Sequence, residues 1–207
     1  MKSFFILIIF ITFSCKEAVK EVVKATKPES VLEGQYYDIK NYPIKLFLPK
    51  GYKNIERYEI LKQAQNIENE FLRKQLVKSI ENQIQNNIDK QYLFSDGDGS
   101  SISLAEIPYM PLSIEIASQI LGMIQMESQQ LYEQTDLRRI LIDKRFKGNK
   151  SLKFFKAIYK TETTIDSQTL GYFHLYVLEI KNRLFVINLE VPYEANYEPY
   201  FLKTRIY

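Results

Sequence analysis

The 207-residue chain has one cysteine, Cys15, and one histidine, His174. One cysteine allows no intramolecular disulfide, and one histidine cannot build a zinc site that needs several imidazoles. A Ser–His–Asp triad would require His174, which lies between Tyr172 and Tyr176 in a strand-like stretch, where histidines are usually surface or core residues. These residue types therefore nominate no catalytic residue and no metal ligand.

Glycine is also scarce, and the seven glycines form neither of the phosphate-binding patterns GxxxxGK and GxGxxG. An acidic stretch containing Asp96 and Asp98 raises the question of calcium. A calcium loop starting at Asp96 would need glycine at its sixth position and a carboxylate at its twelfth, where Ser101 and Ile107 stand. The stretch is therefore interpreted as a turn, and no cofactor or metal is expected.

Basic residues only slightly outnumber acidic ones, and the formal net charge is +3. Such a balance gives no argument for a nucleic-acid partner. Hydrophobic residues make up 45% of the chain and aromatic residues 14%, which is enough to fill a sizeable core. The length fits one domain preceded by a tether.

The N-terminal segment, residues 1–15, reads MKSFFILIIFITFSC. A basic Lys2 followed by an apolar run at 4–13 is typical of a secretory signal. The run is shorter than the roughly twenty residues that a helix needs to cross a bilayer. Because Cys15 directly follows the small residue Ser14, the segment resembles a bacterial lipoprotein signal.

The lipoprotein resemblance implies that residues 1–14 are removed and that Cys15 carries the lipid. It places the protein in the cell envelope, exported and membrane-anchored on the periplasmic or surface side. Thioether lipidation would explain an unpaired cysteine in an exported protein, and several acyl chains hold a protein stably on a membrane. The alternatives are an ordinary signal peptide with an incidental cysteine and an uncleaved anchor helix.

Residues 15–35 mix charges with small residues and include Pro28 and Gly34, so they are predicted to be a flexible tether. A partner-binding helix is the alternative, since Val19, Val22 and Val23 would share a face. Residues 36–207 are expected to form a single globular domain.

Within this domain apolar residues recur every second residue in some segments, which indicates strands, and about every 3.6 residues in others, which indicates helices. Helices are predicted over 55–88, with a break near 65–69, and over 113–134, where Ser113 can cap the first turn. Strands are expected at 44–48, 92–95, 102–107, 140–146, 155–159, 170–180 and 184–191. The strands at 92–95 and 102–107 are predicted to form a hairpin around 96–100, and those at 170–180 and 184–191 to pair across 181–183. Clustered rather than alternating helices and strands favour an α+β fold, an antiparallel sheet of about six to seven strands covered by helices.

The element order and the stretches "IKLFLPKGY" and "NRLFVINLEVP" resemble the PsbP/DcrB-like domain over residues 36–207. Families with this fold are mostly non-catalytic extrinsic or lipoprotein modules that assist larger assemblies. The resemblance therefore implies an accessory role and supplies no catalytic residues.

A local excess of basic residues covers 138–160. If these residues lie on adjacent strands, Arg138, Arg139, Lys144 and Arg145 would contribute to a positive face that contacts anionic headgroups or an acidic partner. The alternative is a solvated face balanced by acids from elsewhere. The nine basic residues, set against Asp143 alone, are at positions 138, 139, 144, 145, 147, 150, 153, 156 and 160.

Two functions remain open. The first is a non-enzymatic binding or accessory module, held on the membrane through lipidated Cys15 and contacting an unknown envelope protein. The second is an envelope hydrolase that uses paired carboxylates, for which 25 Asp and Glu are available but no spacing selects a pair.

Overall fold

The computed structural model describes residues 32–40, 42, 44–85, 91–148 and 152–207. The predicted signal, Cys15 and nearly all of the predicted tether lie outside these residues. The first described strand, β1 (Gly34–Asp38), begins two residues before the domain start predicted from the sequence.

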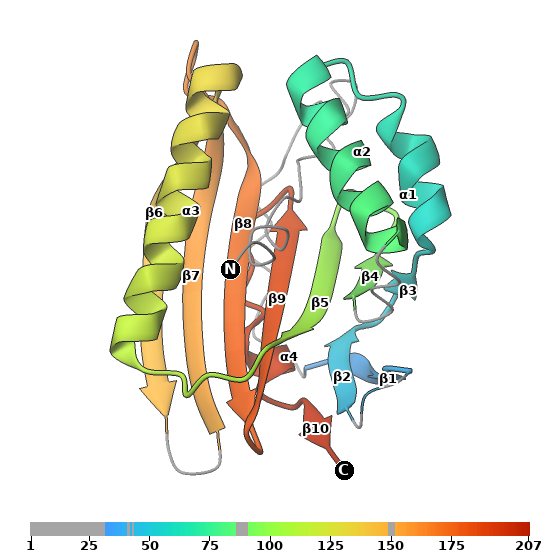
Figure 1. Cartoon of the computed structure of the whole chain (residues 1–207), viewed down its shortest axis with the longest axis vertical. Helices are drawn as coiled ribbons and strands as arrows, with labels where there is room; N and C mark the ends of the chain where they lie inside the picture. The colour runs from blue at the N-terminus through green and yellow to red at the C-terminus, as the bar shows by residue number, and fades with distance from the viewer. Residues whose placement is uncertain (1–31, 41, 43, 86–90, 149–151) are drawn as a thin grey trace.

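A seven-stranded antiparallel sheet forms the centre of the domain (Figure 1). Its spatial order is β3-β4-β5-β9-β8-β7-β6, so consecutive strands mostly pair as hairpins and β6 lies at one edge. The predicted α+β class and the predicted number of strands in the main sheet are confirmed. The strands are β3 (Lys53–Asn54), β4 (Gln91–Ser95), β5 (Ser101–Ile107), β6 (Leu137–Gly148), β7 (Leu152–Thr163), β8 (Thr169–Ile180) and β9 (Arg183–Val191).

Helices cover one face of this sheet. α1 (Arg57–Ala64) and α2 (Glu70–Gln85) pack through Ile60, Ala64, Leu76 and Ile80 near Leu93 of β4. α3 (Ile114–Gln134) lies over β6 and β7 in Figure 1. The predicted break at 65–69 separates α1 from α2.

Ser113 starts α3 in the predicted way. Its hydroxyl oxygen accepts a hydrogen bond from the backbone N–H of Ile116 at 3.3 Å. This bond satisfies one of the free N–H groups of the first turn. On α3, Ala117 and Ile124 are buried, while Ile116, Ile120 and Leu121 are partly buried against the same cluster.

The opposite face of the main sheet is covered by a second sheet, which the sequence did not separate from the first. Its order is β1-β2-β10, with β2 (Ile44–Pro49) in the middle and β10 (Arg205–Ile206) beside it. Ile44, Leu46 and Leu48 of β2 are at most 1% exposed. β2 therefore packs face to face on the main sheet instead of extending it.

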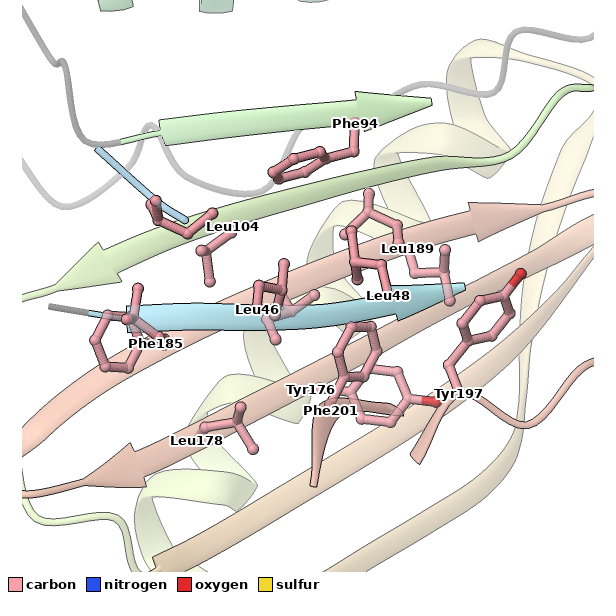
Figure 2. Packing of buried hydrophobic residues seen from close by; sticks show 14 of the residues in the cluster. Leu46, Leu48, Phe94, Leu104, Tyr176, Leu178, Phe185, Leu189, Tyr197 and Phe201 are labelled. Carbon is pink, nitrogen blue, oxygen red and sulfur yellow. The ribbon is translucent and has the colours of Figure 1, made fainter. Parts of the chain in front are cut away.

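Figure 2 shows this contact. Leu46 and Leu48 of β2 lie over Leu104 and Leu189 of the main sheet, together with Phe201 of the short helix α4 (Glu198–Phe201). Fully burying a leucine side chain stabilises a fold by about 2 kcal/mol. The second sheet and α4 thus cover the apolar face of the main sheet that is opposite the helices.

Alternation along β8 and β9 divides the core between the two faces. Phe173, Leu175 and Val177 belong to the cluster under α3. Phe185, Ile187, Leu189 and Val191 belong to the cluster under the second sheet. Each of these sets therefore shares a face, and the β8–β9 pairing predicted across 181–183 is confirmed.

The predicted β4–β5 hairpin is present, and its tip is held by Asp96. The Asp96 Oδ1 atom accepts hydrogen bonds from the backbone N–H groups of Asp98 at 2.9 Å and Ser100 at 3.0 Å. Gly97 and Gly99 take φ values of +83° and +91°, which glycine adopts without strain. The acidic stretch is therefore a hydrogen-bonded turn.

Candidate functional site

The four basic residues predicted to share a face lie on β6, but on both sides of it. Arg138 is paired in register with Glu162, and Arg145 with Lys156, both on the second-sheet side. Arg139 is paired with Thr161 and Lys144 with Ala157, on the helix side. The register shift between Leu141 and Asp143 leaves Ile142 without a Cα partner, and this bulge changes which side chains face which way.

Carboxylates from elsewhere in the chain neutralise most of the basic cluster. Glu162 forms ion pairs with Arg138 and Lys160. Glu179 pairs with Lys153 at 3.0 Å, and Glu190 pairs with Arg139 at 3.1 Å. These acids belong to strands β7, β8 and β9, and all three lie outside 138–160, so the composition of that stretch alone does not reveal them. Contact with an anionic surface stays a prediction.

Glu198 of α4 binds three of the basic side chains. It accepts Lys156 at 3.0 Å, Lys147 at 3.5 Å and Arg145 at 3.8 Å. Burial by itself would raise the pKa of Glu198, but the bond from Lys156 and the nearby charges of Lys147 and Arg145 outweigh it and lower the pKa. Lys156 is only 4% exposed and also binds Asp143 at 2.8 Å, so this group ties α4 to β6 and β7.

Lys144 differs from its neighbours. Within the described part of the chain it has no carboxylate partner, whereas Arg138, Arg139 and Arg145 each have one. Lys144 is exposed on the edge strand. Its charge is therefore available to a molecule in solution.

Next to this charge, β6 exposes a short apolar run. Ile140, Leu141 and Ile142 are 37%, 40% and 46% exposed at the middle of the strand. Among the described strands only β7 pairs with β6, so the opposite side of β6 keeps its backbone N–H and C=O groups available. We call this side, with its exposed side chains, the β6 edge.

His174 is buried in the layer under the second sheet and is 1% exposed. Its Nδ1 atom lies 3.1 Å from the Tyr176 hydroxyl, and Tyr197 meets its ring edge-on at 6.0 Å. Burial lowers the pKa of His174 to about 4, and the charge of Lys156 adds to this. The ring is therefore neutral at physiological pH and packs as a core residue.

The helix side of the sheet contains a second group that the sequence did not indicate, which we call the Arg139 cluster: Arg139, Glu190 and Glu127. The Arg139 guanidinium lies across the Phe173 ring, 4.4 Å from its centroid, and reaches Glu190 from three strands away. The side chains of Arg139 and Glu190 are 8% and 11% exposed.

Both carboxyls of the Arg139 cluster titrate near neutrality. Burial raises the pKa of Glu190 and of Glu127 to about 7, although the positive charge of Arg139 acts in the opposite direction. Two acids that share one cation can hold a proton at neutral pH. The sequence carries one indication of this cluster, which is that the acidic Glu190 interrupts the apolar run of β9.

Two further features bear on function. In the described residues, no group of three or more His, Cys, Asp or Glu side chains is placed to hold a metal ion. None of the described helices combines the length and apolar character needed to cross a membrane.

Comparison with known proteins gives structural similarities only. No family model matches the chain, and no curated protein matches it. The solution structure of cyanobacterial PsbP (CyanoP) from Synechocystis is 10% identical, with a TM-score of 0.49, over 87% of this chain and 96% of that one. The Ran-binding protein Mog1p of Saccharomyces cerevisiae is 11% identical, with a TM-score of 0.45, over 79% of each chain. At these values neither similarity transfers a partner or a residue role.

Proposed function

We propose that this protein is a bacterial cell-envelope lipoprotein that acts as a non-enzymatic binding module. The observation that carries the proposal is the position of the only cysteine, Cys15, directly after the apolar run 4–13 and Ser14. Lipid attachment is the chemistry that this position fits best. Mature Cys15 would be the membrane end of the molecule.

The spacing between Cys15 and the domain agrees with such an arrangement. Residues 16–33 separate the cysteine from β1, and an extended segment of this length reaches at most about 60 Å. The domain would then sample a shell around its anchor, in which a partner held in the same membrane is encountered at high local concentration.

A binding role is supported by how the domain uses its charged groups. Glu162, Glu179 and Glu198 hold basic side chains, and their pKa values are lowered in doing so. Groups engaged in this way hold the strands together. Among the described residues the exposed apolar side chains include the β6 edge, several tyrosines, and single residues such as Ile114, Met126 and Ile165.

The alternative, carboxylate hydrolysis, would have to use Glu127 and Glu190, which both interact with Arg139. A hydrolase needs one acid to protonate a leaving group and another to activate water or attack the substrate. Glu190 is 9% exposed and its carboxylate is bound by Arg139. The Arg139 cluster is therefore better suited to holding α3 against the sheet.

The anchor is tested by replacing the cysteine. Expressed in a bacterial host, Cys15→Ala should move from the membrane pellet to the soluble fraction after a high-salt wash. Ser14→Ala is the matched control, because it keeps the cysteine behind a small residue and should stay in the pellet. Mass spectrometry of the N-terminal peptide should show a diacylglyceryl group on Cys15 only in the control. A Cys15→Ala protein that still sediments with membranes would overturn the proposal.

A further inference from the structure

We propose that the β6 edge binds an extended acidic segment of a partner protein, which adds as an eighth strand to the main sheet. This inference rests on the proposed binding function and names the surface and the kind of partner. The free side of β6 runs along twelve residues, Leu137–Gly148, which exceeds the roughly five to six residues of a typical strand.

Backbone and apolar contacts would supply the affinity. An added strand pairs with N–H and C=O groups that no described strand uses. It would also cover Ile140, Leu141 and Ile142, which are exposed although they are apolar and lie at the centre of the edge. Cross-strand pairs with such residues favour β-branched partners.

Charge indicates the composition of the partner. β6 carries five basic residues against Asp143 alone. Arg139 is buried against Glu190, but Arg138, Arg145 and Lys147 stay 44%, 47% and 58% exposed within their ion pairs. Among the described residues Lys144 has no carboxylate partner. The bulge at Ile142 places Lys144 on the helix side of the sheet and Arg145 on the other side, with Arg138. A matching strand would therefore be acidic on both of its faces, with neighbouring acidic residues on either side of an apolar centre.

The same charges disfavour a second copy of this chain as the occupant. Opposite residues in an antiparallel pair share a face, so a self-paired edge would be centred between Leu141 and Ile142. That register places Arg138 opposite Arg145 and Arg139 opposite Lys144. Like charges directly opposite each other destabilise a strand pair, so the β6 edge favours an acidic partner over itself.

The test uses the full-length protein in mild detergent and a fluorescein-labelled peptide, Glu-Glu-Val-Thr-Val-Glu-Glu. The anisotropy of this peptide should rise to saturation as protein is added. Lys-Lys-Val-Thr-Val-Lys-Lys should bind at least about tenfold more weakly, because its lysines repel the basic residues of β6. Glu-Glu-Val-Pro-Val-Glu-Glu should be weakened as much, because proline has no N–H to donate to the hydrogen bonds between the strands. Hydrogen exchange should slow at residues 137–148 on adding the first peptide.

Lys144→Glu is the decisive variant, because reversing this charge breaks no ion pair of the described chain. This variant should bind the acidic peptide at least about fivefold more weakly than the unmodified protein does, and should bind the basic peptide more tightly. Lys40→Glu, an exposed lysine on the turn before β2, changes the net charge equally and should leave binding within about twofold. Thermal melts check that both variants fold.

Three results would overturn the inference: no saturable binding of the acidic peptide, equal weakening by Lys40→Glu, or exchange protection outside β6. A dimer that forms through β6 in sedimentation, and that Lys144→Glu alters, would also overturn it by naming the second copy as the occupant. Because these assays are done in detergent, failure here leaves the Cys15 fractionation result unaffected, and the two proposals are tested separately.

Discussion

Glu190 should make the protein less stable as the pH rises from 5 to 8, which is the reverse of ordinary acid denaturation. Its pKa in the folded protein is about 7, compared with 4.5 for the unfolded chain. Between these values the folded state binds more protons than the unfolded state, so stability is highest below about pH 5 and falls until the pH exceeds 7. At about 1.4 kcal/mol per pKa unit, the fall between pH 5 and pH 8 amounts to about 2 to 3 kcal/mol.

The assay is urea denaturation of the full-length protein in mild detergent at pH 5, 6, 7 and 8. Glu190→Gln keeps the shape of the side chain and removes its titration, so the slope of unfolding free energy against pH should become flatter by about 2 to 3 kcal/mol over this range. Glu127→Gln should flatten it further, since burial raises the pKa of Glu127 in the same direction.

Glu59→Gln is the control, because Glu59 is exposed on α1 and its replacement should leave the slope unchanged. A Glu190→Gln protein with the wild-type slope would refute the reasoning. So would a wild-type stability that rises steadily from pH 5 to pH 8, because the Arg139 cluster would then be fully ionised in the folded state.

The remaining predictions concern packing. A Cβ atom at Gly171 would lie 2.6 Å from the carbonyl oxygen of Val191, so Gly171→Ala should lower the free energy of unfolding by about 1 to 3 kcal/mol. At Gly122, inside α3, a Cβ atom meets nothing within 4 Å, and Gly122→Ala should raise the free energy of unfolding by about 1 kcal/mol. Leu46→Ala should cost about 2 to 5 kcal/mol, because Leu46 is fully buried between the two sheets. Urea titration checks all three, and an unchanged midpoint for Gly171→Ala or Leu46→Ala would contradict the packing described.

Features set by neighbouring residues could be predicted from the sequence. The Ser113 cap, the break between α1 and α2, and the β4–β5 and β8–β9 hairpins each depend on residues close together in the chain. Local spacing and turn chemistry are sufficient for such elements. The α+β class followed from the order of these elements.

Features that join distant segments were not predictable in the same way. The alternation at 44–48 indicates a strand, but it does not say that β2 leaves the main sheet and pairs with β10 across about 160 residues. The basic stretch 138–160 looked unbalanced because its acceptors include Glu179, Glu190 and Glu198. The bulge at Ile142, which moves Arg145 to the side of Arg138, has no signature in the order of residues.

The position of β2 between β1 and β10 has a consequence for how the chain folds. Ile44 pairs with Ile206, so the second sheet stays incomplete until almost the whole described sequence is available. Contacts between such distant residues form late, because closing a long loop is entropically costly. A chain that emerges N-terminus first would therefore leave one edge of β2 unpaired until residues 205–206 are available.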